Sequence, residues 1–209
     1  MQQNRLAELF STDHASNGYY KNYYNYLYEL LQSLDLQVLT KVTQCFLEAR
    51  QMGSTIFFAG NGGSAATASH FAQDLAEVGR KANVKSFKTL SLTDNVSFIT
   101  AIGNDYGFEK IFLIQMKELF KKNDVLVVIS ASGNSRNVVE AANYAKEKGG
   151  ISIGLVGFDG GELSKICDHI VHIDSNRGEY GPVEDIHLIL DHMITSYLMF
   201  SLQMESVKK

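Results

Sequence analysis

The chain has 209 residues and a formal net charge of −4, from 19 basic and 23 acidic side chains. This charge gives no sign of the basic stripe that nucleic-acid-binding proteins use, and no apolar run approaches the ~20 residues that a membrane helix needs. We therefore expect neither nucleic acid nor a membrane as a partner. Because no signal peptide is recognisable and Cys45 and Cys167 stand far apart, we expect reduced thiols in a soluble, cytoplasmic protein.

The first fifty residues are predicted to be helical. Tyrosine and leucine recur at helical spacing over residues 20–34, and the pattern continues over 36–52 until Gly53 and Ser54 end it. We divide the chain into an N-terminal helical extension, residues 1–34, and one α/β domain, residues 35–209. The tyrosine-rich stretch 19–26 fits either packing on its own domain or a subunit interface, where tyrosine is favoured.

Short apolar runs alternate with amphipathic segments from residue 55 onward. The predicted strands are Thr55–Ala59, Lys88–Leu92, Val125–Ser130, Ile151–Val156 and His169–Ile173. The predicted helices are Ser64–Val78, Glu109–Phe120, Asn137–Lys148, Gly161–Cys167 and Val183–Leu202. Continuous apolar strands between helices indicate an α/β fold with a five-stranded parallel sheet covered on both faces. Ligands of such sheets bind beyond the carboxyl ends of the strands.

A glycine-rich loop follows the first predicted strand and opens a helix, with the sequence Gly60-Asn61-Gly62-Gly63-Ser64. Glycines let the backbone approach an anion, and a helix N-terminus offers unpaired N–H groups. The loop lacks the lysine of a Walker A motif and does not match the dinucleotide fingerprint. A tight turn capped by Ser64 is the alternative interpretation.

A serine-rich loop occupies the corresponding place after the third predicted strand, with the sequence Ser130-Ala131-Ser132-Gly133-Asn134-Ser135. Its hydroxyl and backbone donors are suited to surrounding a phosphate. A turn capped by Ser135 is the alternative here. Because two such loops stand at matching positions of one predicted sheet, the sequence predicts a phosphorylated ligand, held by local donors rather than by a positive field.

Two predicted helices carry paired histidines and carboxylates. His70 and Asp74 are four residues apart and share one helix face. Glu184 and His192 are eight residues apart, about 80° around the helix axis, so they too can project toward a common point. Such a quartet could bind Zn²⁺ or a similar divalent ion, although a solvated His–Asp pair is the simpler alternative. His187 points elsewhere, and we interpret it as a structural or supporting residue.

These motifs, together with Gly103-Asn104-Asp105-Tyr106-Gly107-Phe108, resemble the sugar-isomerase (SIS) domain and most closely the phosphoheptose isomerases. The resemblance runs from about Leu34 to Leu202. It implies a three-layer, flavodoxin-like sandwich preceded by N-terminal helices, assembled as a homotetramer with its sites between subunits. Tyr23, Tyr24 and Tyr26 are then candidates for an added interface. The implied reaction converts sedoheptulose 7-phosphate to D-glycero-D-manno-heptose 7-phosphate through an enediolate, for heptose in surface polysaccharide.

The resemblance also assigns roles to individual residues. Asp74 is the implied base and His192 its acid/base partner, with Glu184 as the reserve base. The implied metal is Zn²⁺ or another divalent ion, with ligands His70, Asp74, Glu184 and His192. Asn104 and Asp105 would bind sugar hydroxyls. The full set of implied substrate contacts is Asn61, Gly62, Gly63, Ser64, Asn104, Asp105, Ser130, Ala131, Ser132, Ser135 and Glu184.

The chain departs from the family pattern at several of these positions. Asp74 stands where the family has glutamate, Glu184 where it has glutamine, and Ala131 where it has threonine. The shorter Asp74 and the added charge of Glu184 leave the identity of the base open. Two alternatives follow, namely an isomerase of another sugar phosphate and a non-catalytic SIS protein that senses a phosphosugar or binds a partner. The retained histidines and carboxylates favour an enzyme.

Overall fold

The computed structural model describes residues 4–12 and 14–207. Within them, one sheet of five parallel strands has the order β2-β1-β3-β4-β5. The strands are β1 (Thr55–Gly60), β2 (Lys88–Ser91), β3 (Val125–Ser130), β4 (Ile151–Gly157) and β5 (His169–Ile173). This is the flavodoxin-like order, in which ligands bind where the strand order reverses, between β1 and β3. The predicted strands and the parallel sheet are confirmed.

The inner strands β1, β3 and β4 are largely apolar because both faces of the sheet are buried there, whereas the edge strand β2 is partly exposed and mostly polar. In β1, Ile56 and Phe58 point into one core, whereas Phe57 and Ala59 point into the other. The neighbouring β3 is buried along its whole length. Alternate residues of these inner strands therefore pack into two separate cores, which accounts for their apolar runs in the sequence.

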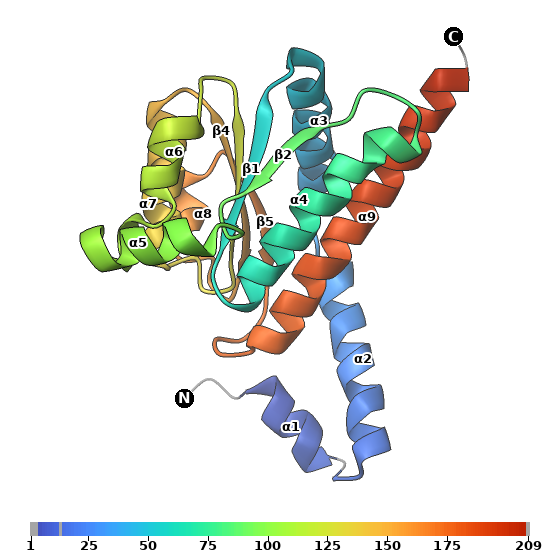
Figure 1. Cartoon of the computed structure of the whole chain (residues 1–209). Coiled ribbons are helices and arrows are strands. Elements are labelled where there is room, and N and C mark those ends of the chain that lie inside the picture. Colours follow the sequence, from blue (N-terminus) through green and yellow to red (C-terminus); the bar gives the residue numbers. More distant parts are fainter. Residues whose placement is uncertain (1–3, 13, 208–209) are drawn as a thin grey trace.

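Helices cover both faces of the sheet and make three layers (Figure 1). One face carries α3 (Leu36–Met52), α4 (Gly63–Lys81) and α9 (Tyr180–Val207), and the other carries α5 (Val96–Tyr106), α6 (Leu113–Leu119), α7 (Arg136–Glu147) and α8 (Leu163–Ile166). Helices α4 and α9 lie side by side over much of their length (Figure 1). The predicted three-layer sandwich is confirmed. No helix among the described residues is long and apolar enough to cross a membrane.

Two helical segments differ from the sequence pattern. Helix α5 was not predicted, because its glycine and asparagine at positions 103 and 104 are typical of a turn. It forms because the Asn95 side chain accepts a hydrogen bond from the Phe98 N–H and caps an apolar first turn. The predicted helix 109–120 is interrupted, with a 3₁₀ turn η1 (Phe108–Lys110) before α6.

The N-terminal helices α1 (Arg5–Thr12) and α2 (Ser16–Gln32) contact the beginning of α9 through polar bonds. The Tyr26 hydroxyl and the backbone N–H of Arg5 both donate to the carboxylate of Glu179, which is fully buried. Tyr23 donates to Asp185 at 2.6 Å. Tyr26 is thus buried inside its own chain, whereas Tyr24 is 66% exposed. The helices predicted for this segment are confirmed, and the domain boundary at residue 34 stays a prediction.

Candidate functional site

The two predicted phosphate loops lie beside each other at one edge of the sheet. They follow β1 and β3, which are adjacent parallel strands and end at the same edge. A pair of reciprocal amide hydrogen bonds joins them. Asn61 Nδ2 donates to Asn137 Oδ1 at 2.9 Å, and Asn137 Nδ2 donates to Asn61 Oδ1 at 2.8 Å. The first loop is therefore fixed to the start of α7, the helix that the second loop opens.

The glycine-rich loop brings α9 against the beginning of α4. A Cβ atom at Gly63 would stand only 2.2 Å from Glu184 Oε2, so only glycine lets this carboxylate lie against the helix start. Burial raises the pKa of the Glu184 carboxyl, and the negative charge of Asp185 adds to the effect. The N-terminus of a helix favours a nearby negative charge. Glu184 thus already supplies an anionic group at this end of α4.

The serine-rich loop presents its hydroxyls together. Ser130 Oγ lies 3.5 Å from both Ser132 Oγ and Ser135 Oγ, a separation long enough that these contacts are weak and leave the groups available to a ligand. The loop needs Gly133, which has a φ of +63° and whose added Cβ would stand 2.0 Å from the Gly160 carbonyl oxygen. The fold therefore fixes a tight loop with convergent hydroxyl donors.

A groove of about 770 Å³ opens at these loops, and Asn61 and Ser135 line it. Lys110 and Arg136, which the sequence reasoning missed, line it as well, and both pair with Glu140, at 2.7 and 3.2 Å. The hydrogen bond from Lys110 holds the pKa of Glu140 below its usual range. The sequence feature that could have identified Arg136 is its position directly after the serine-rich loop, at the start of a helix.

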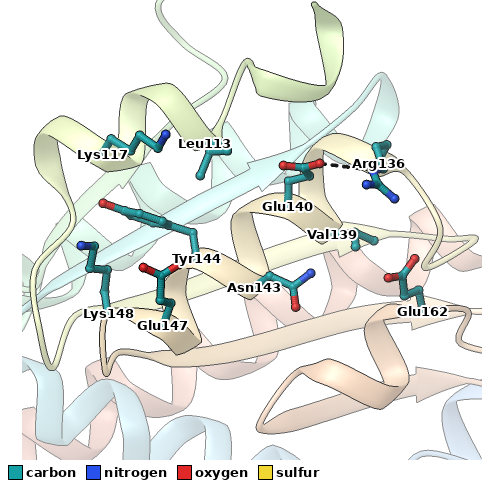
Figure 2. Close-up of a pocket in the computed structure, with 10 residues that line it drawn as sticks. All are labelled: Leu113, Lys117, Arg136, Val139, Glu140, Asn143, Tyr144, Glu147, Lys148 and Glu162. Atoms are coloured by element: carbon teal, nitrogen blue, oxygen red, sulfur yellow. Dashed lines mark hydrogen bonds and ion pairs between the residues drawn. The ribbon is translucent and has the colours of Figure 1, made fainter.

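A second groove, of about 610 Å³, lies between α6 and α7 and shares the Arg136–Glu140 pair (Figure 2). Its remaining wall comes from side chains such as Lys117, Tyr144 and Glu147. None of the residues that line it was predicted as a site residue. The larger groove at the loops is therefore the one that the predicted residues share.

A cluster of potential metal ligands forms where α4 and α9 lie side by side. One ligand atom from each of His70, Asp74, Asp191 and His192 lies within 4.8 Å of all the others. His70 Nε2 and His192 Nε2 are 3.5 and 3.9 Å from Asp74 Oδ2. Two imidazole nitrogens and two carboxylate oxygens are donors that Zn²⁺ accepts. The chain thus offers a donor set that fits a divalent metal.

This cluster contains three of the four predicted ligands, with Asp191 in addition and Glu184 outside it. Asp191 is fully buried, and neither carboxylate oxygen has a hydrogen-bond partner among the described residues. Burial, followed by the charge of Asp74, raises the pKa of Asp191 to about 7. Sequence reasoning missed this residue. The sequence feature that could have identified it is an acidic residue within the buried face of α9, four residues after the buried His187.

Three other residues that the sequence singled out, Asn104, Asp105 and His187, lie apart from this cluster. Asn104 and Asp105 are exposed at the end of α5, where Asn104 Nδ2 donates to Asp105 Oδ1 at 2.7 Å. His187 is fully buried, and neither of its ring nitrogens has a partner in hydrogen-bonding geometry within the described residues. Burial lowers the pKa of His187 to about 3, and only the backbone of Val156 opposes this effect. Its position in the core agrees with the structural interpretation.

Comparison with known proteins gives consistent matches. The SIS domain family matches residues 18–157. The phosphoheptose isomerase of Aliarcobacter butzleri is 40% identical over 157 residues, which cover 75% of this chain and 81% of that protein. The phosphoheptose isomerase of Aneurinibacillus thermoaerophilus is 39% identical over 167 residues, with coverages of 79% and 80%. A solved phosphoheptose isomerase from Neisseria gonorrhoeae superposes with a TM-score of 0.77 at 31% identity, covering 87% of this chain and 95% of that one.

Proposed function

The chain belongs to the SIS-domain family of phosphoheptose isomerases, and we propose that it converts sedoheptulose 7-phosphate to D-glycero-D-manno-heptose 7-phosphate. The observation that carries the proposal is the arrangement along α4. Its N-terminus adjoins the two loops, and it contributes His70 about two turns later and Asp74 about three turns later to the His–Asp cluster. Helix α4 thus begins beside the loops proposed to bind the phosphate and carries the groups proposed to transfer the proton.

The separation of the two ends suits a long sugar. His70 stands seven residues after Gly63, ~10 Å along the helix axis at 1.5 Å per residue. In a heptulose 7-phosphate the phosphate and the reacting carbons C1 and C2 occupy opposite ends of the carbon chain. The arrangement therefore favours a heptose phosphate over a shorter sugar phosphate.

The phosphate is proposed to bind at the serine-rich loop. Ser130, Ser132 and Ser135 supply the hydroxyls, and Arg136 supplies a positive charge beside them. The carboxylate of Glu184 lies at the start of α4 and would repel a phosphate placed directly against it. Asn61 and the glycines that follow would contact the sugar between the loops. Ala131 contributes only its backbone, since it lacks the hydroxyl of a threonine.

The chemistry requires two proton transfers. We assign Asp74 as the base that removes a proton from C1 of the ketose and delivers it to C2, because its carboxylate lies between the two histidines. His192 moves a proton between the oxygens on C1 and C2. A divalent ion held by the cluster, for which Zn²⁺ is our proposal, would stabilise the negative charge of the enediolate. Glu184 remains the reserve base, and its raised pKa suits a proton-transfer group.

We also propose a cytoplasmic homotetramer with sites between subunits, which acts in heptose biosynthesis for surface polysaccharide. The support is an apolar face along α3 and α9, whose exposed side chains are Leu36, Met193, Tyr197, Phe200 and Met204. In such an assembly Asn104 and Asp105, exposed on the single chain, would complete the site of a neighbouring subunit and bind sugar hydroxyls there. The free cysteines fit a reducing compartment.

A substrate panel tests the assignment. The Zn²⁺-loaded protein would be given sedoheptulose 7-phosphate, fructose 6-phosphate and ribulose 5-phosphate, and NMR would follow aldose formation. We expect kcat/KM to be at least about tenfold higher for the heptulose, a difference of about 1.4 kcal/mol. A preference for a shorter sugar would reassign the substrate. Binding of all three without turnover would contradict the isomerase and favour a sensing protein.

A further inference from the structure

We infer that Asp191 is a ligand of the divalent metal ion at the α4–α9 cluster, in the place that the sequence pattern assigns to Glu184. The inference rests on the proposed isomerase only for the role of the ion, which is to stabilise the enediolate. Binding of the ion can be measured without any sugar, so the two proposals can fail separately.

Geometry is the first argument. The ligand atoms of His70, Asp74, Asp191 and His192 all lie within 4.8 Å of one another, so one ion could contact all four after small side-chain adjustments. The rings of His70 and His192 have centroids 5.2 Å apart, and both Nε2 atoms face the same carboxylate oxygen of Asp74. Glu184 instead has its carboxylate at Gly63, two helical turns nearer the start of α9.

The surroundings of Asp191 are the second argument. Its carboxylate is 0% exposed, and both oxygens lack a partner within the described residues. Burying a carboxylate without compensation is costly, and the carboxylate of Asp74 nearby increases the cost. No lysine or arginine within residues 4–12 and 14–207 forms an ion pair with either aspartate. A bound dication would compensate both charges at once.

The position of Asp191 also gives the site an inner and an outer side. Asp191 approaches from the core, whereas the side chains of His70 and His192 are 43% and 54% exposed. A cavity of about 230 Å³, lined in part by Asp74 and His192, adjoins the cluster. Because Asp191 and the two histidines already supply three ligands, the carboxylate of Asp74 can lie beside the ion and still serve as the base, and the outer side stays open to substrate oxygens.

Metal titration of variants tests the inference. Protein freed of metal by dialysis against a chelator would be titrated with Zn²⁺ by calorimetry, and with Co²⁺ by absorption spectroscopy. We expect one ion per wild-type chain. Because loss of a residue that merely supports a ligand already costs 10–100-fold, D191N should weaken Zn²⁺ binding at least about tenfold and change the Co²⁺ spectrum. E184Q should change the affinity by less than about threefold, like E205Q, which removes an exposed carboxylate from the same helix.

Thermal melting distinguishes a lost ligand from a damaged fold. Without metal, D191N should melt no lower than the wild type, because it removes a buried negative charge beside Asp74. Excess Zn²⁺ should raise the Tm of the wild type and of E184Q, and raise that of D191N far less. If D191N does not fold, Asp191→Ser provides the same comparison.

Three results would overturn the inference. They are wild-type Zn²⁺ affinity in D191N, loss of binding in E184Q instead, and no Zn²⁺ binding by the wild type at millimolar concentration. If Zn²⁺ binding depends on Asp191 but the Zn²⁺-loaded protein has no isomerase activity, Asp191 is supported as a ligand and the proposed function is refuted. Isomerase activity of the wild type, together with wild-type Zn²⁺ affinity in D191N, would support the proposed function and refute Asp191 as a ligand.

Discussion

At the scale of single residues, the inner face of α9 carries ionisable side chains in places that disfavour charge. His187 and Asp191 are both fully buried, four residues apart on one helix face. Burial keeps His187 neutral, and burial with a neighbouring carboxylate raises the pKa of Asp191. We assign the first to the structure of the core and the second to the metal site, because only Asp191 lies within the cluster of potential ligands.

The pH dependence of stability tests the environment of His187. Its pKa is about 3 in the folded chain against 6.5 for a free histidine, so below pH 6.5 the unfolded chain takes up a proton that the folded chain does not. The contribution of His187 is therefore complete above pH 6.5 and is lost as the pH falls, by up to about 1.4 kcal/mol per pH unit. In urea unfolding between pH 7.5 and 5, H187Q should lose less stability than the wild type. The exposed H14Q should follow the wild type, and parallel profiles for H187Q and the wild type would contradict the account.

Gly133→Ala tests the serine-rich loop. The substitution adds a side chain at a φ of +63° and forces it against the Gly160 carbonyl, so we expect the free energy of unfolding to fall by about 2–4 kcal/mol. Gly178→Ala is the matched control, because its φ is +94° with no atom within 4 Å of the added Cβ. It should cost only about 1–2 kcal/mol. Equal losses in the two variants would show that the contact with Gly160 is not decisive.

At the scale of elements, the buried Glu179 connects the N-terminal helices to α9. Tyr26 donates to this carboxylate, and burial, followed by that hydrogen bond, raises the pKa of the Tyr26 hydroxyl. Tyr26→Phe leaves Glu179 buried with fewer donors, so urea unfolding should show a loss of about 1–3 kcal/mol. Tyr24→Phe, at an exposed position of the same helix, should be neutral. A neutral Tyr26→Phe would mean that the carboxylate is satisfied without it.

The sequence pattern was sufficient to predict those helices and strands in which apolar residues recur at a regular spacing. Continuous apolar runs predicted the strands, and the repeat of buried positions predicted α4, α7 and α9. It failed at α5, where Gly103 and Asn104 are typical of a turn although the Asn95 cap and tertiary packing produce a helix. It missed Asp191 because residue spacing alone does not tell which acid on α9 faces α4. That information lies in how the two helices pack.

At the scale of the whole molecule, the apolar face of α3 and α9 is the feature that a single chain leaves unexplained. A cavity of about 370 Å³ between these helices is lined by apolar side chains such as Leu36, Met193 and Tyr197. Tyr197 and Phe200 are each 60% exposed. A second copy of the chain would bury this surface, as the proposed tetramer requires.

Light scattering after size-exclusion chromatography tests the assembly. We expect the wild type to have four times the 23.2 kDa mass of one chain. The double variant Tyr197→Glu/Phe200→Glu should give smaller species, because it introduces charge into an apolar interface. Leu119→Glu, on the opposite face of the sheet and 43% exposed, serves as the control and should keep the wild-type mass. A monomeric wild type would contradict the tetramer.

Isomerisation of a heptose phosphate at the α4–α9 cluster can be followed in a single assay. Sedoheptulose 7-phosphate would be incubated with the Zn²⁺-loaded wild type, D74N and H192A, and the aldose signal followed by NMR. We predict steady conversion by the wild type and a fall in kcat of at least about 10²-fold in each variant, as expected on loss of a general acid or base, with melting curves that show all three are folded. No conversion by the wild type, or undiminished conversion by both variants, would rule out isomerisation at this cluster.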